Sequence, residues 1–296
     1  MRARAQFAAL PDGRRHFHDG PIDLILEAFG DRGEVSAAYD AAARRFSTVL
    51  DELCAELPLL GQPLSAEPAG VVARRMARAV APFQQTHFLT PMAAVAGAVA
   101  EEVLAAMTDA ARLERAYVNN GGDIALHLQG DATFQIGMVG RPDRLSLFGR
   151  ATISASGTAR GIATSGWRGR SFSLGVADAV TVIAATAAQA DAAATLIANA
   201  VDLPGHPAIT RVPAARLDPQ SDLGERLVTR AVGPLSPAEI GAALAAGAQE
   251  AERFRARGWI EAAALRLGGE TLLVGGGASL YKQCAASHSE LFHALG

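Results

Sequence analysis

Hydrophobic residues in this chain follow two spacings, one typical of strands and one typical of helices. Two short apolar runs, 14–18 and 22–28, flank the dipeptide Asp19-Gly20, which suits the positive φ angles of a tight turn. The chain is therefore expected to open with a β-hairpin.

Apolar residues recur every three or four positions from 35 to 57, which predicts an amphipathic helix that Pro58 ends. Two further helices rich in small residues are expected at 71–80 and 93–107. In the second of these, Gly97 allows another stretch of backbone to approach closely.

The middle of the chain changes to the spacing of short strands. Strand-like segments at 116–118, 124–128, 134–139, 145–148 and 158–163 are separated by Gly, Asp and Arg-Pro turns. This succession predicts an antiparallel meander.

Strands and helices alternate again in the second half of the chain. Ser236, Pro237 and Glu239 have the pattern of a capping box, so a helix of about five turns should begin there and end near Gly258. The polar, proline-rich segment 203–221 is expected to be a surface loop. The other expected elements are a buried strand at 179–184, an alanine-rich helix at 187–200, and a hairpin of 259–267 with 271–274. The whole predicts an α+β fold, with antiparallel sheets packed against helices in a single domain spanning 1–296.

Composition narrows the class of protein. Half of the 296 residues are hydrophobic, only 5% are aromatic, and the formal charge is −3. Few aromatic side chains and no excess of basic residues argue against a nucleic-acid partner. Cys54 and Cys284 lie outside any metal-ligand spacing, and no apolar run suggests a signal peptide or a membrane span. We therefore expect a cytoplasmic protein that does not contact a membrane.

The first candidate site segment is Asn119-Asn120-Gly121-Gly122-Asp123, between two predicted strands. Its two glycines allow a ligand to approach the backbone, and Asp123 can accept hydrogen bonds from a hydroxyl or a ring N–H group. The alternative is an ordinary hairpin turn closed by an asparagine side chain.

The second candidate segment, Thr164-Ser165-Gly166, follows a predicted strand and precedes Arg168 and Arg170. Hydroxyl, amide and guanidinium groups together suit a phosphate or a carboxylate, and the alternative is a solvated loop. Ser165 is a candidate catalytic residue, although it lies in no nucleophile-elbow pattern, so a hydrolase triad is not supported.

Oxygen-bearing side chains also follow one face of the alanine-rich helix. Asp191 and Thr195 are four residues apart, and such a pair can bind one Mg²⁺ ion, which prefers oxygen ligands. The alternative is a solvated helix face with Asp191 near the positive end of the helix dipole. Asp178, before the buried strand, is a second candidate catalytic residue, whose role is open between orienting group, metal ligand and cap.

Taken in order, these segments resemble the ApbE-like superfamily, and most closely its uncharacterised branch, uncharacterised protein family 0280. The resemblance covers most of 20–201 and implies an ApbE-like, T-fold-related arrangement of sheets and helices. The matching segments are 20–24, 92–101, 118–124, 161–166, 177–182 and 190–195.

The better-known members of the superfamily are FAD:protein FMN transferases, which cleave FAD with the help of Mg²⁺ and attach FMN to a threonine or serine of a target protein. The resemblance implies a small-molecule ligand and an acceptor protein as partners, and it leaves a homo-oligomer open. It also implies that Asp191 and Thr195 bind the metal. The implied flavin site comprises Asn119, Asn120, Gly121, Gly122 and Asp123, and the loop closing over it comprises Thr164, Ser165 and Gly166, with Arg168 adding positive charge.

One segment departs from the family pattern. Transferases of the superfamily continue from the Thr-Ser-Gly loop into a segment with a histidine and an Asp-Pro dipeptide, whereas residues 167–175 contain neither histidine nor proline. Flavin transfer is thus either retained or replaced on this scaffold. One alternative is an enzyme acting on a different planar or carboxylated metabolite without flavin, through Arg168, Arg170 and Asp178. The other is a non-catalytic protein that binds a metabolite or a partner.

Overall fold

A computed structural model describes residues 5–140, 147–276 and 282–283. The chain forms two compact units, each assembled from separate stretches of sequence. Unit 1 comprises Met1–Thr133, Ser154–Ala163 and Ala184–Ala192, and unit 2 comprises Phe134–Ile153, Thr164–Ile183 and Ala193–Gly296. The single-domain organisation over 1–296 stays a prediction.

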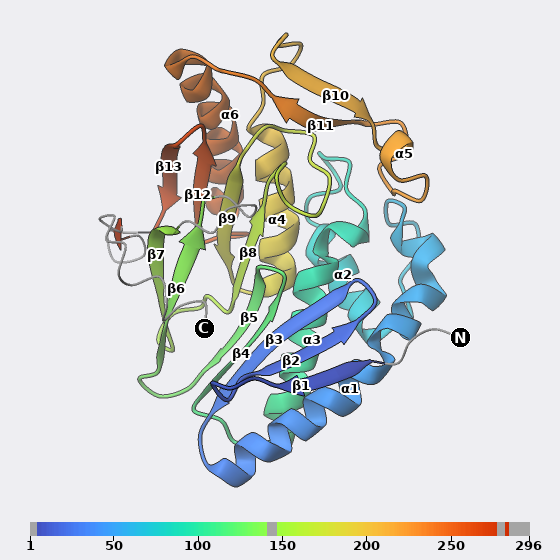
Figure 1. The fold of residues 1–296 in the computed structure, drawn as a ribbon, viewed down its shortest axis with the longest axis vertical. Helices are drawn as coiled ribbons and strands as arrows, with labels where there is room; N and C mark the ends of the chain where they lie inside the picture. Colours follow the sequence, from blue (N-terminus) through green and yellow to red (C-terminus); the bar gives the residue numbers. More distant parts are fainter. Residues whose placement is uncertain (1–4, 141–146, 277–281, 284–296) are drawn as a thin grey trace. The chain divides into compact units, whose positions relative to one another are not determined.

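The strands of unit 1 pair in the order β1–β2–β3–β4–β5–β8, and each neighbouring pair is antiparallel (Figure 1). The expected opening hairpin is confirmed, because Asp19 pairs with Ile22 and Gly20 has a φ of +59°. These strands are β1 (Gln6–Ala9), β2 (Arg15–Asp19), β3 (Ile22–Phe29), β4 (Arg115–Asn120), β5 (Asp123–Leu128) and β8 (Gly161–Ser165), whose last two residues belong to unit 2.

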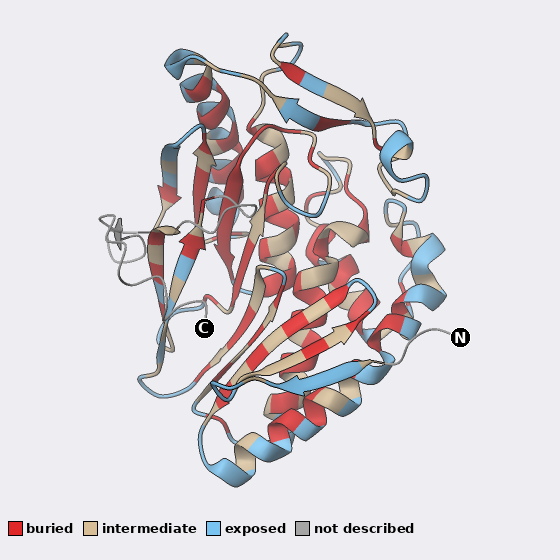
Figure 2. Ribbon diagram, in the orientation of Figure 1, coloured by how far each residue is buried: buried red, intermediate tan, exposed pale blue. Residues whose placement is uncertain are grey.

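Helix α3 (Val95–Ala110), preceded by the short 3₁₀ helix η1 (Pro91–Ala94), lies in the core of unit 1. It packs against α1 (Arg32–Leu60), α2 (Val71–Val80), β4 and β5. Figure 2 shows buried residues along α3, whereas β1 is exposed throughout. Within the described residues, Pro91–Ala110 is the one segment long and apolar enough to cross a membrane, but half of it is buried inside the protein, as in a core helix.

The expectation that Pro58 ends the first helix is wrong, because α1 continues to Leu60. A proline this close to the end of a helix removes only one backbone hydrogen bond. Leu60 is completely buried, and the amide of Gly61 donates to the carbonyl oxygen of Leu57 at 2.9 Å, so packing and a backbone cap support the last turn.

Unit 2 contains three groups of paired strands. The first group is β6 (Thr133–Val139), β7 (Leu147–Ser154) and β14 (Lys282–Gln283), the second is β9 (Ala179–Ala184), β12 (Ala262–Leu267) and β13 (Glu270–Gly275), and the third is the ribbon of β10 (Ile209–Pro213) with β11 (Leu227–Val232). The buried strand at 179–184 and the terminal hairpin are confirmed, and all six residues of β9 are buried. Helix α6 (Pro237–Ala256) begins with the predicted capping box. Helix α4 (Ala187–Ala200) runs from unit 1 into unit 2.

Two predictions about connectivity need correction. The middle strands do not form one meander, since β5 pairs with β8 in unit 1 while β6 and β7 belong to a separate sheet in unit 2. Residues 145–146 of the expected fourth strand lie outside the described residues. The segment 203–221 is not loop throughout, because its β-branched residues pair as β10 with β11 and α5 (Ala214–Leu217) follows. The α+β class with antiparallel sheets and helices is confirmed.

Candidate functional site

The turn between β4 and β5 is a tight hairpin of two glycines. Gly121 and Gly122 have φ angles of +66° and +113°, which a residue with a side chain rarely adopts. The Oδ1 atom of Asn119 accepts a hydrogen bond from the amide of Gly122 at 2.8 Å, so the asparagine closes the turn. The hairpin interpretation is therefore correct for the backbone, and Asp123 begins β5 directly after it.

The hairpin is tied to the start of α3. Asn120 is buried, and its side-chain amide donates to the carbonyl oxygen of Ala96 at 3.1 Å. The side-chain amide of Asn120 is thus hydrogen-bonded within the protein, which indicates that Asn120 positions the turn.

Asp191 reaches the same start of α3 from helix α4. Its Oδ2 atom accepts a hydrogen bond from the amide of Gly97 at 3.1 Å. Burial raises the pKa of the Asp191 carboxyl well above its usual range, and the negative charge of Asp123 raises that pKa further, while the amides of Gly97 and Ala96 lower it. Asp123 is therefore close enough for its charge to act on the Asp191 carboxyl, and both residues belong to unit 1.

Two neighbouring carboxylates with little access to water repel each other, and a bound cation reduces this repulsion. Within residues 5–140, 147–276 and 282–283, no group of three or more His, Cys, Asp or Glu side chains could hold a metal ion. Thr195, one turn after Asp191 on α4, is half-buried and offers a hydroxyl oxygen. Oxygen donors of this kind fit Mg²⁺, which also takes ligands from water and from substrate phosphates.

In unit 2, the hydroxyl-bearing residues lie at the end of a strand. The expected strand end at 163 is two residues too early, since β8 runs to Ser165. The Oγ1 atoms of Thr164 and the buried Thr181 are 2.9 Å apart, so the threonine hydroxyl is hydrogen-bonded to the neighbouring strand β9. Ser165 itself is half-buried.

Arg168 and Asp178 form an ion pair in unit 2. The Nε atom of Arg168 donates to Oδ1 of Asp178 at 2.7 Å, and the amide of Gly268 donates to Oδ2 at 2.8 Å. The guanidinium of Arg168 also lies 4.2 Å from the ring centroid of Trp167. Gly166 is pressed against this pair, because a Cβ atom there would lie 2.6 Å from the carbonyl oxygen of Asp178. Both oxygens of Asp178 therefore have protein donors.

Sequence reasoning missed the contact that Glu101 makes beside Asp191. The carboxylate of Glu101 accepts a hydrogen bond from the amide of Ala188 in the first turn of α4 at 2.7 Å. Gly97 was expected to allow close backbone contact, and a Cβ atom there would lie 2.3 Å from the carbonyl oxygen of Ala187. Gly97 gave a signal in the sequence, whereas Glu101 stood out only as the last residue of the matching segment 92–101.

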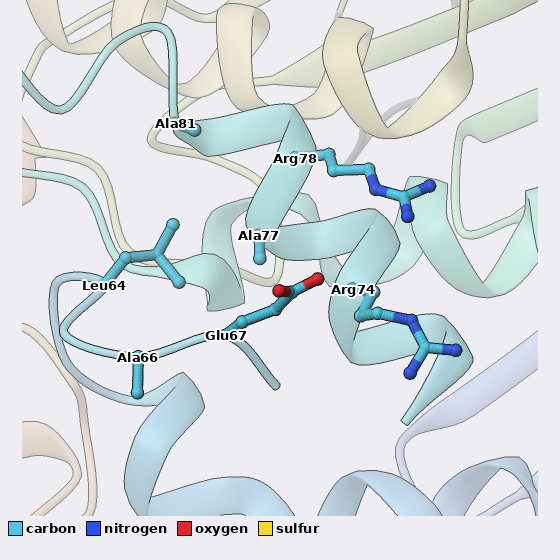
Figure 3. A pocket seen from close by; sticks show the side chains of 7 residues that line it. All are labelled: Leu64, Ala66, Glu67, Arg74, Ala77, Arg78 and Ala81. Carbon is cyan, nitrogen blue, oxygen red and sulfur yellow. The ribbon is translucent and has the colours of Figure 1, made fainter. Parts of the chain in front are cut away.

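A pocket of about 300 Å³ lies elsewhere in unit 1 (Figure 3). It sits between α2 and the segment that precedes it, and Figure 3 shows Glu67 reaching across it towards the helix. It contains none of the predicted site residues. Its lining residues are Leu64, Ala66, Glu67, Arg74, Ala77, Arg78 and Ala81.

The fold and the order of the site segments define an ApbE-like protein, as the resemblance predicted. The family described as AbpE bacteria matches residues 7–273, and the chain belongs to this family.

Two relatives match part of this chain. A UPF0280 protein of Methanopyrus kandleri is 41% identical over 133 residues, which cover 45% of this chain and 50% of the relative. A UPF0280 protein of Methanothrix thermoacetophila is 35% identical over 166 residues, which cover 56% of this chain and 67% of the relative. The match thus spans half to two thirds of these relatives and confirms the uncharacterised branch.

Solved structures of two flavin transferases show a more distant likeness. A variant of Flavin Transferase ApbE from Vibrio cholerae has a TM-score of 0.48 at 11% identity, covering 93% of this chain and 98% of that protein. The flavinyl transferase ApbE of Pseudomonas stutzeri, in its apo form, has a TM-score of 0.41 at 12% identity, covering 92% and 95%. Likeness at this level carries no conclusion about activity.

Proposed function

We propose that this protein is an ApbE-like enzyme that binds a flavin nucleotide and, with Mg²⁺ bound by Asp191 and Thr195, cleaves the pyrophosphate of FAD. The FMN part is transferred to a hydroxyl group of an acceptor protein, and AMP leaves. We place this activity in the cytoplasm, where the acceptor or a second copy of the chain would be its protein partner.

The observation that carries this proposal is the pairing of Asp123 and Asp191. Two neighbouring carboxylates repel each other where water is scarce, so a positive ligand would stabilise them together. Backbone amides at the start of α3 hold Asp191 without neutralising it. Bound Mg²⁺ would supply positive charge to the phosphate oxygens of the substrate.

The residues of the chain have separate tasks in this proposal. The turn Gly121-Gly122 leaves room for a ligand beside the backbone, and Asp123 offers an acceptor to a hydroxyl or a ring N–H group. Thr164, Ser165 and Gly166 form the second ligand-binding segment, with Ser165 as the candidate to orient the acceptor hydroxyl.

The second candidate function is an enzyme that acts on another planar or carboxylated metabolite without flavin. It is favoured by residues 167–175, which lack the histidine and the Asp-Pro dipeptide of the transferases. The ion pair of Arg168 with Asp178 weighs against it, because the guanidinium already has an anionic partner at 2.7 Å.

The test is FAD hydrolysis with water as the acceptor, so that no acceptor protein is needed. Purified protein is first analysed by fluorescence and mass spectrometry for retained flavin. It is then incubated with FAD in Mg²⁺ or in a chelator, and FMN and AMP are separated by chromatography. We expect Mg²⁺-dependent product formation, and at least a roughly 100-fold lower rate for Asp191→Ala with little loss of folding.

The matched control is Asp40→Ala, which removes an exposed carboxylate from α1. It should leave the rate unchanged. Metal-independent binding of another metabolite would favour the second candidate function, and full activity of Asp191→Ala would remove this residue from metal binding.

A further inference from the structure

The first turn of α4, which leads to Asp191, is enclosed on two sides by glycines of unit 1. A Cβ atom on Gly97 of α3 would lie 2.3 Å from the carbonyl oxygen of Ala187. A Cβ atom on Gly161 of β8 would lie 2.0 Å from the carbonyl carbon of Thr186. Since Cβ atoms are not found this close to other atoms, both positions require glycine for this packing.

Hydrogen bonds connect the starts of the two helices in both directions. The amide of Gly97 in α3 donates to Asp191 of α4, and the amide of Ala188 in α4 donates to Glu101 of α3. The N-cap residue of α3 is Ala94, which provides no side-chain hydrogen bond. Each carboxylate therefore satisfies a donor in the first turn of the other helix, where the helix dipole favours negative charge.

Glu101 is itself held in place from the opposite side. Its Oε1 atom accepts the amide of Ala188, while its Oε2 atom lies 3.3 Å from Nη1 of Arg75 on α2. The side chain of Glu101 is only 15% exposed. The carboxylate is therefore fixed between α2 and α4.

We propose that Gly97, Gly161 and Glu101 are positioning residues that fix the first turn of α4 and thereby orient Asp191 for metal binding. This inference rests on the proposed function for the identity of the metal. Glu101 and Gly161 act through the backbone of α4, because neither has a hydrogen bond to Asp191 among the described contacts, whereas Gly97 also donates directly to the Asp191 carboxylate. Groups around a ligand that fix its orientation commonly change metal affinity about 10- to 100-fold when they are removed.

Mn²⁺ is the probe, because its binding to the full chain can be followed by electron paramagnetic resonance without any substrate. Glu101→Ala removes the acceptor of the Ala188 amide, so we expect Mn²⁺ to bind about tenfold more weakly. Glu101→Gln keeps a carbonyl oxygen at that place, so we expect affinity within about twofold of the unchanged protein. Recovery of Mn²⁺ affinity in Glu101→Gln would show that Glu101 acts by orienting the first turn of α4 and not merely by packing.

Glu102→Gln is the matched control. Glu102 pairs with Arg45 at 2.8 Å and with Arg75 at 2.9 Å, and its described contacts do not include α4. The variant should lower thermal stability while leaving Mn²⁺ affinity unchanged. Equal weakening by Glu101→Ala and Glu102→Gln would overturn the inference, because general loosening would then explain both.

Gly161→Ala is a second, independent variant, because the nearest atoms to a Cβ there belong to Thr186 and Ala187 and not to the Glu101 carboxylate. It should also weaken Mn²⁺ binding. Unchanged Mn²⁺ affinity of Glu101→Ala in a protein that binds Mn²⁺ would overturn the positioning role alone. Absence of Mn²⁺ binding in the unchanged protein would overturn the metal site and this inference together, whereas Mn²⁺ binding without FAD cleavage would contradict only the proposed reaction.

Discussion

At the scale of single residues, the candidate site separates into side chains with protein partners and side chains that could bind a ligand. Asn120 and Asp178 belong to the first group, because their polar atoms are engaged within the fold. Asp123 and Asp191 belong to the second, because both offer carboxylate oxygens and the charge of Asp123 raises the pKa of Asp191. The sequence identified all four residues, but it could not sort them, since the partner of Asn120 lies 24 positions away.

The first residue-scale prediction concerns Asp178. Replacing it with alanine leaves Arg168 without its anionic partner and the amide of Gly268 without an acceptor. We expect a loss of about 3 kcal/mol in the free energy of unfolding, typical of breaking a buried ion pair. Urea denaturation measures this loss, with Asp40→Ala as the exposed control. A loss below about 1 kcal/mol would show that the pair contributes little, as exposed ion pairs do.

At the scale of elements, the sequence predicted structure best where the interacting residues are close together in the chain. The capping box of α6 is such a case, with Ser236 and Glu239 bonded to each other as the spacing predicts. The path of β6 and β7 is the opposite case, because strand periodicity does not say which strand will be the partner. The ribbon of β10 with β11 was missed for the same reason.

The capping box gives a prediction about pH. Hydrogen bonds from the backbone and side chain of Ser236, together with His206, lower the pKa of Glu239 to about 2 from 4.5. A lowered pKa means that the ionised carboxylate stabilises the fold above pH 4.5 and that this stabilisation is lost as the pH falls towards 2. Glu239→Gln should therefore melt below the unchanged protein at neutral pH, and the difference should shrink in acid.

Thermal melting followed by circular dichroism between neutral pH and pH 3 checks this, where pH 3 is about the lowest practical value before general acid unfolding. Ser236→Ala is the companion variant: it should cost about 1 kcal/mol at neutral pH, and part of this cost should also fade in acid because the Ser236 hydroxyl helps to lower the pKa of Glu239. A difference for Glu239→Gln that stays constant with pH would contradict the assigned cause.

At the scale of the whole molecule, the chain leaves and re-enters each compact unit several times. Composition and periodicity predicted the α+β class, but they carry no information about which distant segments share a unit. The resemblance to a known family came instead from the order of the motifs along the chain. The family match over 7–273 agrees with it.

This interleaving leads to a prediction about cooperativity. Both tryptophans, Trp167 and Trp259, belong to unit 2, whereas α1, α2 and α3 belong to unit 1. If the chain is a single domain, tryptophan fluorescence and far-ultraviolet circular dichroism should give coincident urea transitions. Two separated transitions would instead establish independently folding units.

The exchange of hydrogen bonds between α3 and α4 also constrains the order of folding. The amide of Gly97 donates its hydrogen bond to the carboxylate of Asp191, which lies 94 residues later in the chain. Closing so long a loop costs entropy before any contact compensates for it, so joining the two helix starts should be a late event. A newly synthesised chain would therefore keep the first turn of α3 frayed until residue 191 has left the ribosome.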